Sequence, residues 1–305
     1  MKGALTKRIL SFANKAIGFI LFIICAVAIY SKVMTNDNLQ KYGGSIKEQF
    51  LKITWIEWLV LLILFLFNYL LEALKWKQAL KYLNPMTLGQ SFKSVLVGQA
   101  FSFFTPVRSG DYVGRILFLA PENKLKGLAQ MAWTSYAQLL VTLFLGTIGL
   151  FFNLPFLPWL KWVAPFITLA AFIIYFSKGQ FKGWLKKLTS LQISNELKVQ
   201  LMILSLIRYS IFILQFTWVV TILALPIPIL DLWIALVVLL LCLSIIPAIA
   251  LTDLVIRGQL IVLLLAPYYT NSLMLICFST IIWAVNLLLP AIIGSFLLLG
   301  FKIKR

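Results

Sequence analysis

Long apolar runs alternate with short polar segments along almost the whole chain. A helix of about 20 apolar residues crosses the ~30 Å hydrocarbon core of a bilayer. About six runs meet this length, and we expect each to form a spanning helix. The predicted spans are Ala16–Val33, Trp55–Leu74, Gly127–Phe152, Leu154–Phe176, Val199–Leu225 and Asn271–Leu299.

Two further apolar runs are interrupted by polar residues, proline and glycine. The run Ser91–Leu119 carries, in its middle, Thr105, Pro106, Arg108, Ser109, Gly110, Asp111 and Arg115. The run Leu230–Ala266 breaks at Pro247 and then carries Thr252, Asp253 and Arg257. A charge is costly at membrane depth, and non-helical backbone persists there only when it is buried in protein or lines a cavity. Each run therefore predicts a re-entrant hairpin of two half-helices, with Pro106 and Pro247 at the breaks.

Clusters of basic residues orient the predicted elements, because cytoplasmic loops carry an excess of lysine and arginine. The cluster Lys75, Lys77 and Lys81, the basic segment 177–198 and the last residues of the chain all fall on one side. We therefore expect both termini to be cytoplasmic and segment 177–198 to lie as an amphipathic surface helix. Lys93 and Lys124 flank the first hairpin, which we expect to enter from the cytoplasm. No basic residue flanks the second hairpin, which we expect to enter from outside.

The first predicted span contains Ala26-Val27-Ala28, which resembles a signal-peptidase site. Cleavage is one possibility, but we favour a retained signal-anchor helix. In either case, residue 35 emerges on the side opposite the cytoplasm.

The two hairpins share a short motif. Pro106-x4-Asp111-x3-Arg115 recurs as Pro247-x5-Asp253-x3-Arg257, at a shift of 141–142 residues. Each hairpin lies between two predicted spans, and the two sets have opposite orientations. This arrangement is typical of inverted-repeat transporters, which bind substrate near the midplane between broken helices; a chance coincidence of short motifs is the alternative. We predict one membrane domain over 1–305, with repeat 1 at about 55–152, a linker span and basic segment at 153–198, and repeat 2 at about 199–299.

Composition supports an all-α polytopic protein of the cell membrane. Hydrophobic residues make up 62% of the 305 positions, charged residues only 12%, and the mean hydropathy is +0.98. The net charge of +18 comes from lysine clusters between apolar runs, a pattern that favours anionic lipid rather than nucleic acid as the partner. The chain has no histidine, and its three cysteines are isolated in apolar segments. We therefore expect no metal site, no cofactor and no catalytic residue.

Arginines are the main candidates for substrate binding. Four of the six lie within embedded segments: Arg108, Arg115, Arg208 and Arg257. A planar guanidinium forms forked hydrogen bonds with phosphate or carboxylate. Only Asp111 and Asp253 accompany them, so an anionic group would balance about two positive charges. The aspartates are predicted to cap the second half-helices, to pair with Arg115 and Arg257 at i,i+4, or to act in gating or proton coupling. The full predicted binding set is Arg108, Arg115, Arg208, Arg257, Asp111, Asp253, Thr105, Ser109, Gly110 and Thr252.

Further polar residues recur at helical spacing in the predicted spans. They are Gln130, Thr134 and Gln138 in the third span, Gln215 in the fifth, and Asn286 in the last. Such stripes more often join helices than contact ligands. We expect these polar residues to contact and orient the binding residues without contacting the substrate themselves.

One segment carries a resemblance to a known family. The pattern Gly98-x3-Ser102-x3-Pro106-x3-Gly110-Asp111-x3-Arg115 resembles the "N-x-x-x-P-x-R-x-G-E-x-x-R" segment of the lysylphosphatidylglycerol synthase transmembrane family, the flippase-like region of the multiple peptide resistance factor. Lys75-Trp76 is similar to the basic-Trp pair of that family. Around Pro247, Ala248, Ala250 and Leu251 stand where the family has glycine. The resemblance implies a flippase-like membrane domain without the soluble synthase domain.

Three functions remain open on this basis. The favoured one is a flippase-like transporter that moves an anionic lipid or a polyprenyl-phosphate-linked lipid across the cell membrane. A membrane-embedded lipid-modifying transferase is the first alternative, and it would need Asp111 and Asp253 to converge as an acid/base pair. The second is a non-transporting subunit of a lipid or cell-envelope pathway, which would lack a continuous polar cavity.

Overall fold

The computed structural model describes residues 47–105, 108–152, 159–177 and 193–299, and the regular structure in these ranges is entirely helical. The predicted first span, its Ala26-Val27-Ala28 site, Pro106 and most of the basic segment 177–198 lie outside the described residues. The helices are α3 (Trp55–Ala79), α4 (Leu88–Phe103), α5 (Gly110–Ile116), α6 (Lys124–Phe152), α7 (Leu160–Phe176), α9 (Asn195–Ile222), α10 (Ile229–Ile245), α11 (Ala250–Leu265), α12 (Ser272–Trp283) and α13 (Leu289–Leu299). A 3₁₀ turn, Pro121–Asn123, precedes α6, and a π-helical segment, Ala284–Leu288, joins α12 to α13.

Within the described residues, four helical segments are long and apolar enough to cross a membrane. They are Trp55–Ala79, Pro121–Phe152, Asn195–Ile222 and Ser272–Leu298. The helices Leu160–Phe176 and Ile229–Ile245 are apolar but shorter. An all-helical multi-pass membrane protein, as predicted from the apolar runs, agrees with this arrangement.

Both interrupted apolar runs form a helix, a break and a second helix. α4 starts with a capping box in which Thr87 and Gln90 bond each other's backbone N–H groups, and it ends at Phe103. α5 begins at Gly110, and its helix packs directly on α4. In the second run, Ile246 is extended ahead of Pro247, as proline requires of the residue before it, and α11 begins at Ala250.

Glycine permits the tight packing of the first hairpin. A Cβ on Gly114 would lie 2.6 Å from the Cα of Gly98, so the two backbones of α4 and α5 touch directly. A Cβ on Gly110 would collide with the carbonyl of Phe101 at the end of α4. In the second hairpin, Gly258 has open space around it. The glycines of the first hairpin are therefore sites of close backbone contact, whereas Gly258 of the second hairpin is not.

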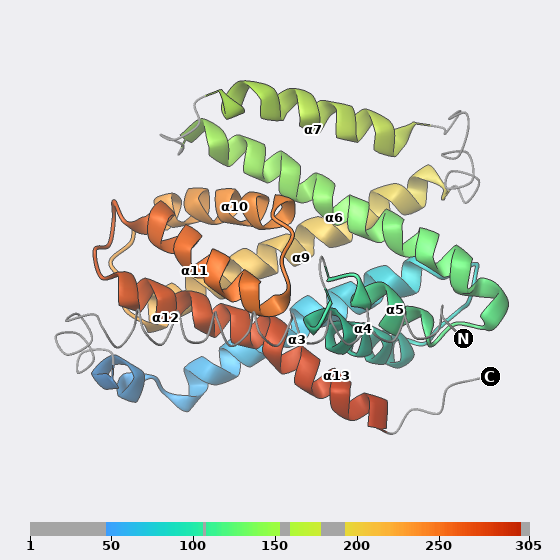
Figure 1. Ribbon diagram of the computed structural model, residues 1–305, viewed down its shortest axis with the longest axis horizontal. Helices are drawn as coiled ribbons and strands as arrows, with labels where there is room; N and C mark the ends of the chain where they lie inside the picture. Colours follow the sequence, from blue (N-terminus) through green and yellow to red (C-terminus); the bar gives the residue numbers. More distant parts are fainter. Residues whose placement is uncertain (1–46, 106–107, 153–158, 178–192, 300–305) are drawn as a thin grey trace, which may run out of the picture.

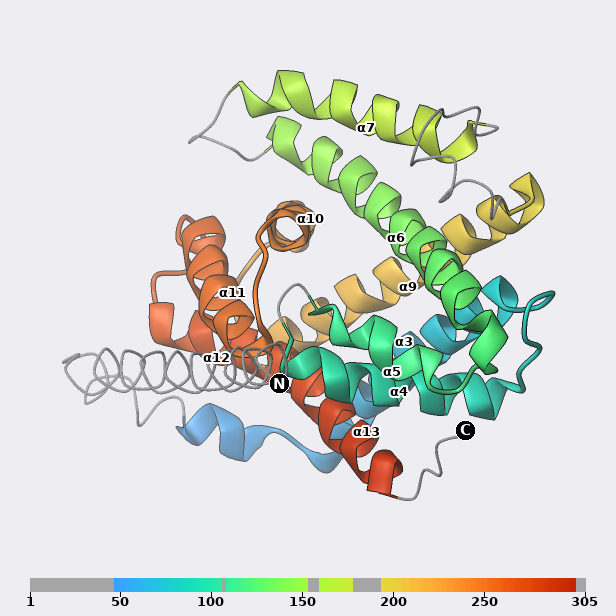
Figure 2. The same ribbon diagram turned by 45° about the vertical axis from the view of Figure 1, so that its right-hand side comes forward.

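The two hairpins pack on a central pair of helices. α3 and α9 pack along each other, α4 of the first hairpin packs on α3, and α10 of the second hairpin packs on α9 (Figures 1 and 2). α4 packs against α13, and α10 packs against α6. Gly294 of α13 meets the Leu96 carbonyl of α4, while a Cβ on Gly146 of α6 would lie 2.6 Å from Leu241 of α10. The first arm of each hairpin is thus held by the last long helix of the other half of the chain.

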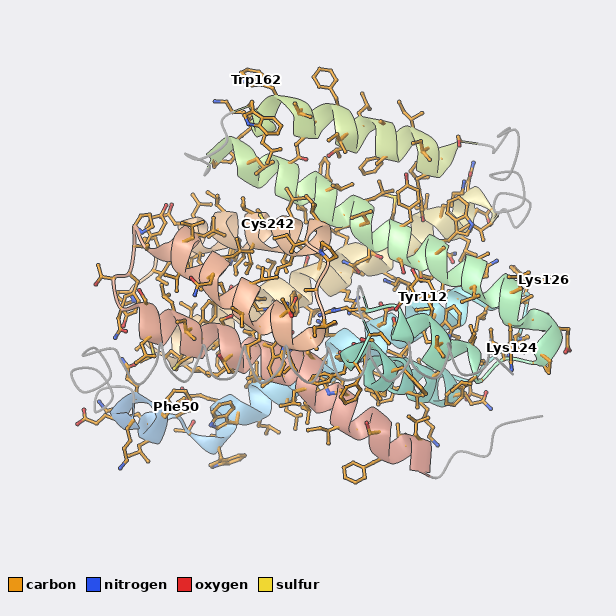
Figure 3. All side chains as sticks on the ribbon, viewed as in Figure 1. Phe50, Tyr112, Lys124, Lys126, Trp162 and Cys242 are labelled. Atoms are coloured by element: carbon orange, nitrogen blue, oxygen red, sulfur yellow. The ribbon has the colours of Figure 1, made fainter. Side chains whose placement is uncertain are left out.

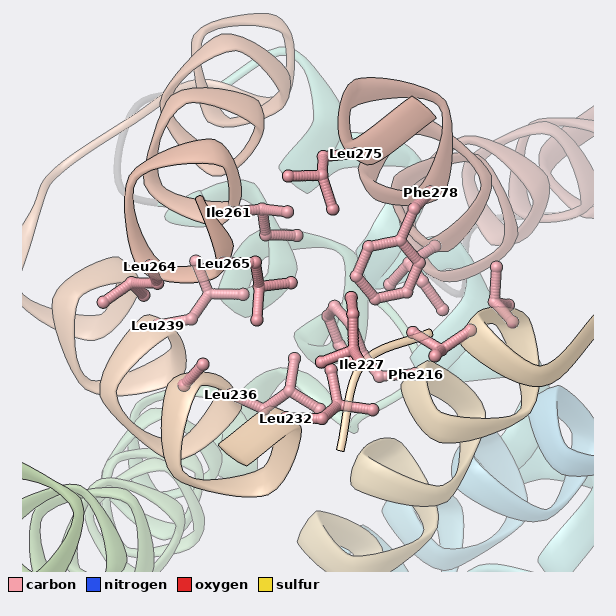
Figure 4. Packing of buried hydrophobic residues seen from close by; sticks show 14 of the residues in the cluster. Phe216, Ile227, Leu232, Leu236, Leu239, Ile261, Leu264, Leu265, Leu275 and Phe278 are labelled. Carbon is pink, nitrogen blue, oxygen red and sulfur yellow. The ribbon is translucent and has the colours of Figure 1, made fainter. Parts of the chain in front are cut away.

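Buried apolar side chains fill the space between α9, α10, α11 and α12. Figure 4 shows Phe216, Leu236, Ile261 and Phe278 converging from these four helices. A second apolar cluster joins α3, α4, α6 and α13. α7 packs on α6 at the outer edge of the molecule, where Trp162 is exposed (Figure 3). The polar residues described next lie between the two apolar clusters.

Candidate functional site

A cavity of about 480 Å³ lies where the two helix breaks meet. The first hairpin contributes Gln99 and Arg108, and the second contributes residues 244–248 together with Asp253 and Arg257. Residues of α3, α6, α9, α10, α12 and the π segment complete the lining. The structure therefore brings together the two breaks that the sequence places about 140 residues apart.

Three arginines and one carboxylate line this cavity: Arg108, Arg208, Arg257 and Asp253. Their formal charges sum to +2. Arg108 is exposed and adopts a left-handed backbone conformation, with φ 54°. Within the part of the chain that the structure describes, it forms no ion pair. A non-glycine residue in this conformation is uncommon and often marks a functional position.

A buried carboxylate, Glu72 of α3, organises the charges beside the cavity. Its Oε1 accepts a hydrogen bond from Arg115 Nη1 at 2.8 Å, and its Oε2 lies 2.9 Å from both Lys75 Nζ and Arg208 Nη1. Asp111 binds the other side of Arg115 through two hydrogen bonds of 2.7 and 2.8 Å. We call Glu72, Lys75, Asp111, Arg115 and Arg208 the Glu72 cluster. It joins α3 to α5 through charge-assisted hydrogen bonds and α3 to α9 through an ion pair.

The two hairpin arginines have different surroundings. Arg115 donates through Nε, Nη1 and Nη2 to two carboxylates, and its guanidinium also lies 5.8 Å from the centre of the Trp76 ring. Arg257 donates only to Asp253 Oδ2, at 3.0 and 3.2 Å. Its Nη1 is buried and has no hydrogen-bond partner among the residues that the structure describes. A buried guanidinium with an unused donor is costly unless something else accepts from it.

The remaining lining of the cavity is divided between polar and apolar side chains. Polar groups come from α3, α4, α6, α9 and the π segment: Asn68, Gln99, Ser135, Gln138, Tyr209 and Asn286. Apolar side chains come from α6, α9, α12 and the π segment, and from one continuous stretch at the end of α10 and in the break after it. We call this stretch the apolar wall: Leu240, Leu243, Ile245, Ile246, Pro247 and Ala248. Ile245 is 66% exposed. The cavity therefore has a cationic polar wall and an apolar wall.

Of the predicted binding residues, Arg108, Arg208, Arg257 and Asp253 line the cavity, whereas the others do not. Thr105 instead holds the first break, since its Oγ1 accepts from Gly110 N at 2.7 Å and donates to Phe101 O at 3.2 Å. Asp111 and Asp253 do not cap their helices, because neither helix has a side-chain cap bond; they form the i,i+4 ion pairs with Arg115 and Arg257. Ser109 precedes α5, and Thr252 lies in the first turn of α11.

The predicted supporting residues also divide into two groups. Gln138 accepts from Lys75 and Arg208 at 3.4 Å, and Gln215 accepts from Asn68 at 3.4 Å. Asn286 lies in the π segment, and its carbonyl accepts from Tyr69 at 2.7 Å. Thr134 bonds only to Met131 of its own helix, and Gln130 does not line the cavity.

Sequence reasoning did not include the central residue, Glu72, among the candidate residues. Lys75 and Lys198 belong to basic segments that the sequence predicts to be cytoplasmic, yet both side chains are buried, at 1% and 3% exposure. Lys93, which flanks the first predicted hairpin, is exposed. The missed signal is the stripe Asn68-x3-Glu72-x2-Lys75, which places three polar side chains on one face of an otherwise apolar helix.

Comparison of the chain with models of protein families and with curated protein sequences finds no match.

Proposed function

We propose that this protein is a flippase-like transporter of an anionic lipid, with polyprenyl-phosphate-linked lipids included in that class. One observation carries the proposal: both helix breaks line one cavity that has a net charge of +2 and an apolar wall. Arginine fits an anionic headgroup by charge and by its forked donors. An apolar wall fits the beginning of a lipid tail. In this proposal, the headgroup crosses the membrane through the cavity while the tails stay in the bilayer.

The helix contacts support an inverted repeat. α3 packs on its counterpart α9, and the contact of α4 with α13 has its counterpart in the contact of α10 with α6. Small residues make both contacts close, with Gly294 in one and Gly146 in the other. In each half, the last helix packs against the first arm of the hairpin of the other half. Two halves matched in this way are suited to alternating access, in which one half rocks against the other around a fixed site.

The cavity lining favours a transporter over a transferase. An acid/base mechanism would need Asp111 and Asp253 to reach one reacting group. Only Asp253 lines the cavity, while both oxygens of Asp111 bond to Arg115. The charged and polar lining also supports transport over the role of a passive subunit.

Reconstituted liposomes test the proposal. We would insert the purified protein into vesicles with fluorescent phosphatidylglycerol and follow its translocation by quenching of the outer leaflet. Arg108→Asn removes a cavity charge from an exposed residue without breaking an ion pair, and asparagine tolerates a positive φ. Loss of a charge-assisted hydrogen bond predicts a fall in rate of about tenfold or more.

Lys126→Gln is the matched control, because it removes an exposed charge at the start of α6, at the edge of the molecule (Figure 3). Its rate should equal that of the wild type. Equal rates for the wild type, Arg108→Asn and empty vesicles would refute transport of phosphatidylglycerol. Wild-type translocation that Arg108→Asn leaves unchanged would refute the site.

A further inference from the structure

We propose that the headgroup recognised by this cavity is a phosphate monoester, a dianion, attached to a lipid. This inference rests on the proposed function and deepens it by naming the class of headgroup. It follows from the net charge of the Glu72 cluster and the cavity lining, from the buried hydrogen-bond donors in the cavity that have no partner among the described residues, and from the position of the apolar wall.

The embedded charges require two negative charges for balance. The Glu72 cluster and the charged residues of the cavity lining together contain five cations, Lys75, Arg108, Arg115, Arg208 and Arg257, and three carboxylates, Glu72, Asp111 and Asp253. Within the Glu72 cluster and the Asp253–Arg257 pair, the acids are already engaged by their own arginines and lysine. The excess of two positive charges is therefore presented to the cavity. A phosphodiester neutralises one of them, whereas an ionised phosphate monoester neutralises both.

Two buried polar groups of the cavity lining have no partner among the described residues. They are Nη1 of Arg257 and the hydroxyl of Tyr209, in side chains from α11 and α9. Buried donors of this kind are normally satisfied. A phosphate monoester has three terminal oxygens that accept strongly. Together with Arg108 and Arg208, these groups supply donors from both hairpins and from α9, enough to surround such a headgroup.

The apolar wall favours a lipid over free phosphate as the source of this group. Leu240, Leu243 and Ile246 line the cavity beside the charged residues, and Ile245 continues this surface outward with 66% of its area exposed. A site for a soluble ion would gain nothing from these side chains. An amphiphile with a small anionic head uses both walls.

Binding in detergent tests this inference separately from transport. We would measure the Kd of the full chain for phosphatidic acid, for phosphatidylglycerol with the same acyl chains, and for inorganic phosphate alone. Phosphatidic acid should bind at least about tenfold more tightly than phosphatidylglycerol, since it adds charge-assisted contacts. Phosphate alone should bind more weakly than either lipid. The affinity for phosphatidic acid should rise between pH 5 and 7.5, because the second ionisation of a phosphate monoester has a pKa of about 6. The affinity for phosphatidylglycerol should stay flat.

Two variants locate the preference in the cavity. Arg257→Gln and Arg108→Asn each lower the net charge to +1 and should reduce the preference for phosphatidic acid, while Lys126→Gln should leave it unchanged. Arg108→Asn keeps the test valid if Arg257→Gln fails to fold, because Arg108 is exposed and unpaired among the described residues.

Each outcome has one meaning. Equal affinities for the two lipids would overturn the headgroup inference and leave the proposed transport of anionic lipids standing. Phosphate alone binding as tightly as phosphatidic acid would overturn the choice of a lipid. Failure of both lipids to bind, together with absent translocation of phosphatidylglycerol, would overturn the proposed function itself.

Discussion

Glu72 and Arg115 are joined by a 2.8 Å hydrogen bond between buried side chains, although 43 residues separate them in the chain. The bond ties the first hairpin to the long helix α3. Because Glu72 also contacts Arg208 of α9, one carboxylate connects a hairpin to the two helices at the centre of the molecule. The stability of the site should therefore depend on Glu72 more than on any arginine of the cavity.

Glu72→Gln should destabilise the protein strongly. It leaves Lys75, Arg115 and Arg208 without their shared carboxylate, and breaking a buried ion pair costs about 3–5 kcal/mol. Thermal unfolding in detergent measures this loss. Glu57→Gln is the control, since Glu57 serves a capping box at the exposed start of α3 where glutamine also fits, and it should cost about 0.5 kcal/mol or less. Similar losses for the two variants would contradict the central role of Glu72.

Lysine should replace Arg257 more readily than Arg115. Arg115 uses three nitrogens to bind two carboxylates, a geometry that needs the planar fork of arginine. Arg257 binds a single oxygen of Asp253, which an ammonium can also do. We expect Arg115→Lys to cost about 1–3 kcal/mol more in unfolding free energy than Arg257→Lys. The reverse order would show that the second hairpin, and not the first, is held by its arginine.

Alanine at two hairpin glycines should have opposite effects. Gly114→Ala places a methyl group 2.6 Å from the Cα of Gly98 and should cost about 1–3 kcal/mol by overpacking. Gly258→Ala meets nothing within 4 Å and lies inside α11, where alanine is favoured over glycine by about 1 kcal/mol. The unfolding midpoint should therefore fall in the first variant and rise in the second. A fall in both would mean that α11 packs more tightly than the structure has it.

Four lysines should divide into two classes of chemical reactivity. Lys75 lies among Glu72, Gln138 and Ser205, and Lys198 lies 4.8 Å from the centre of the Trp133 ring and is almost fully buried. Lys81 and Lys126 are exposed. A water-soluble amine reagent should modify the exposed pair and spare the buried pair, as read by mass spectrometry of the labelled protein. Rapid modification of Lys75 would contradict a closed Glu72 cluster.

The coarse fold follows from the sequence because apolar run length and polar interruptions are local properties. Helix α6 and the break at Pro247 lie where the pattern predicts them. The motif shared by the hairpins also predicts both i,i+4 ion pairs, because residues four apart lie on one face of a helix. The last predicted span is helical, but a π segment interrupts it at Asn286. Pro290, four residues after Asn286, is the sequence signal for that change, because proline has no N–H to donate to the Asn286 carbonyl.

The arrangement of the charges could not be predicted from position along the chain. Glu72 and Lys75 lie close to the basic end of an apolar run, where charged side chains usually reach water. Whether they do so depends on which helices cover them, and here α5, α6 and α9 supply Arg115, Gln138 and Arg208. For the same reason, the sequence could not predict that Arg115 and Arg257 have different ion-pair partners. Only the first has a second carboxylate, and it comes from a different helix.

The contacts of α4 with α13 and of α10 with α6 affect how the protein is made. The ribosome synthesises α4 long before α13. Until α13 is made, the first hairpin lacks this packing partner, and the polar groups of its break and the surface around Leu96 stay uncovered. The second hairpin faces no such delay, because α6 is already in place when α10 emerges. Biogenesis should therefore be most vulnerable between the synthesis of α4 and that of α13, and chains truncated before α13 should be recognised by membrane quality control.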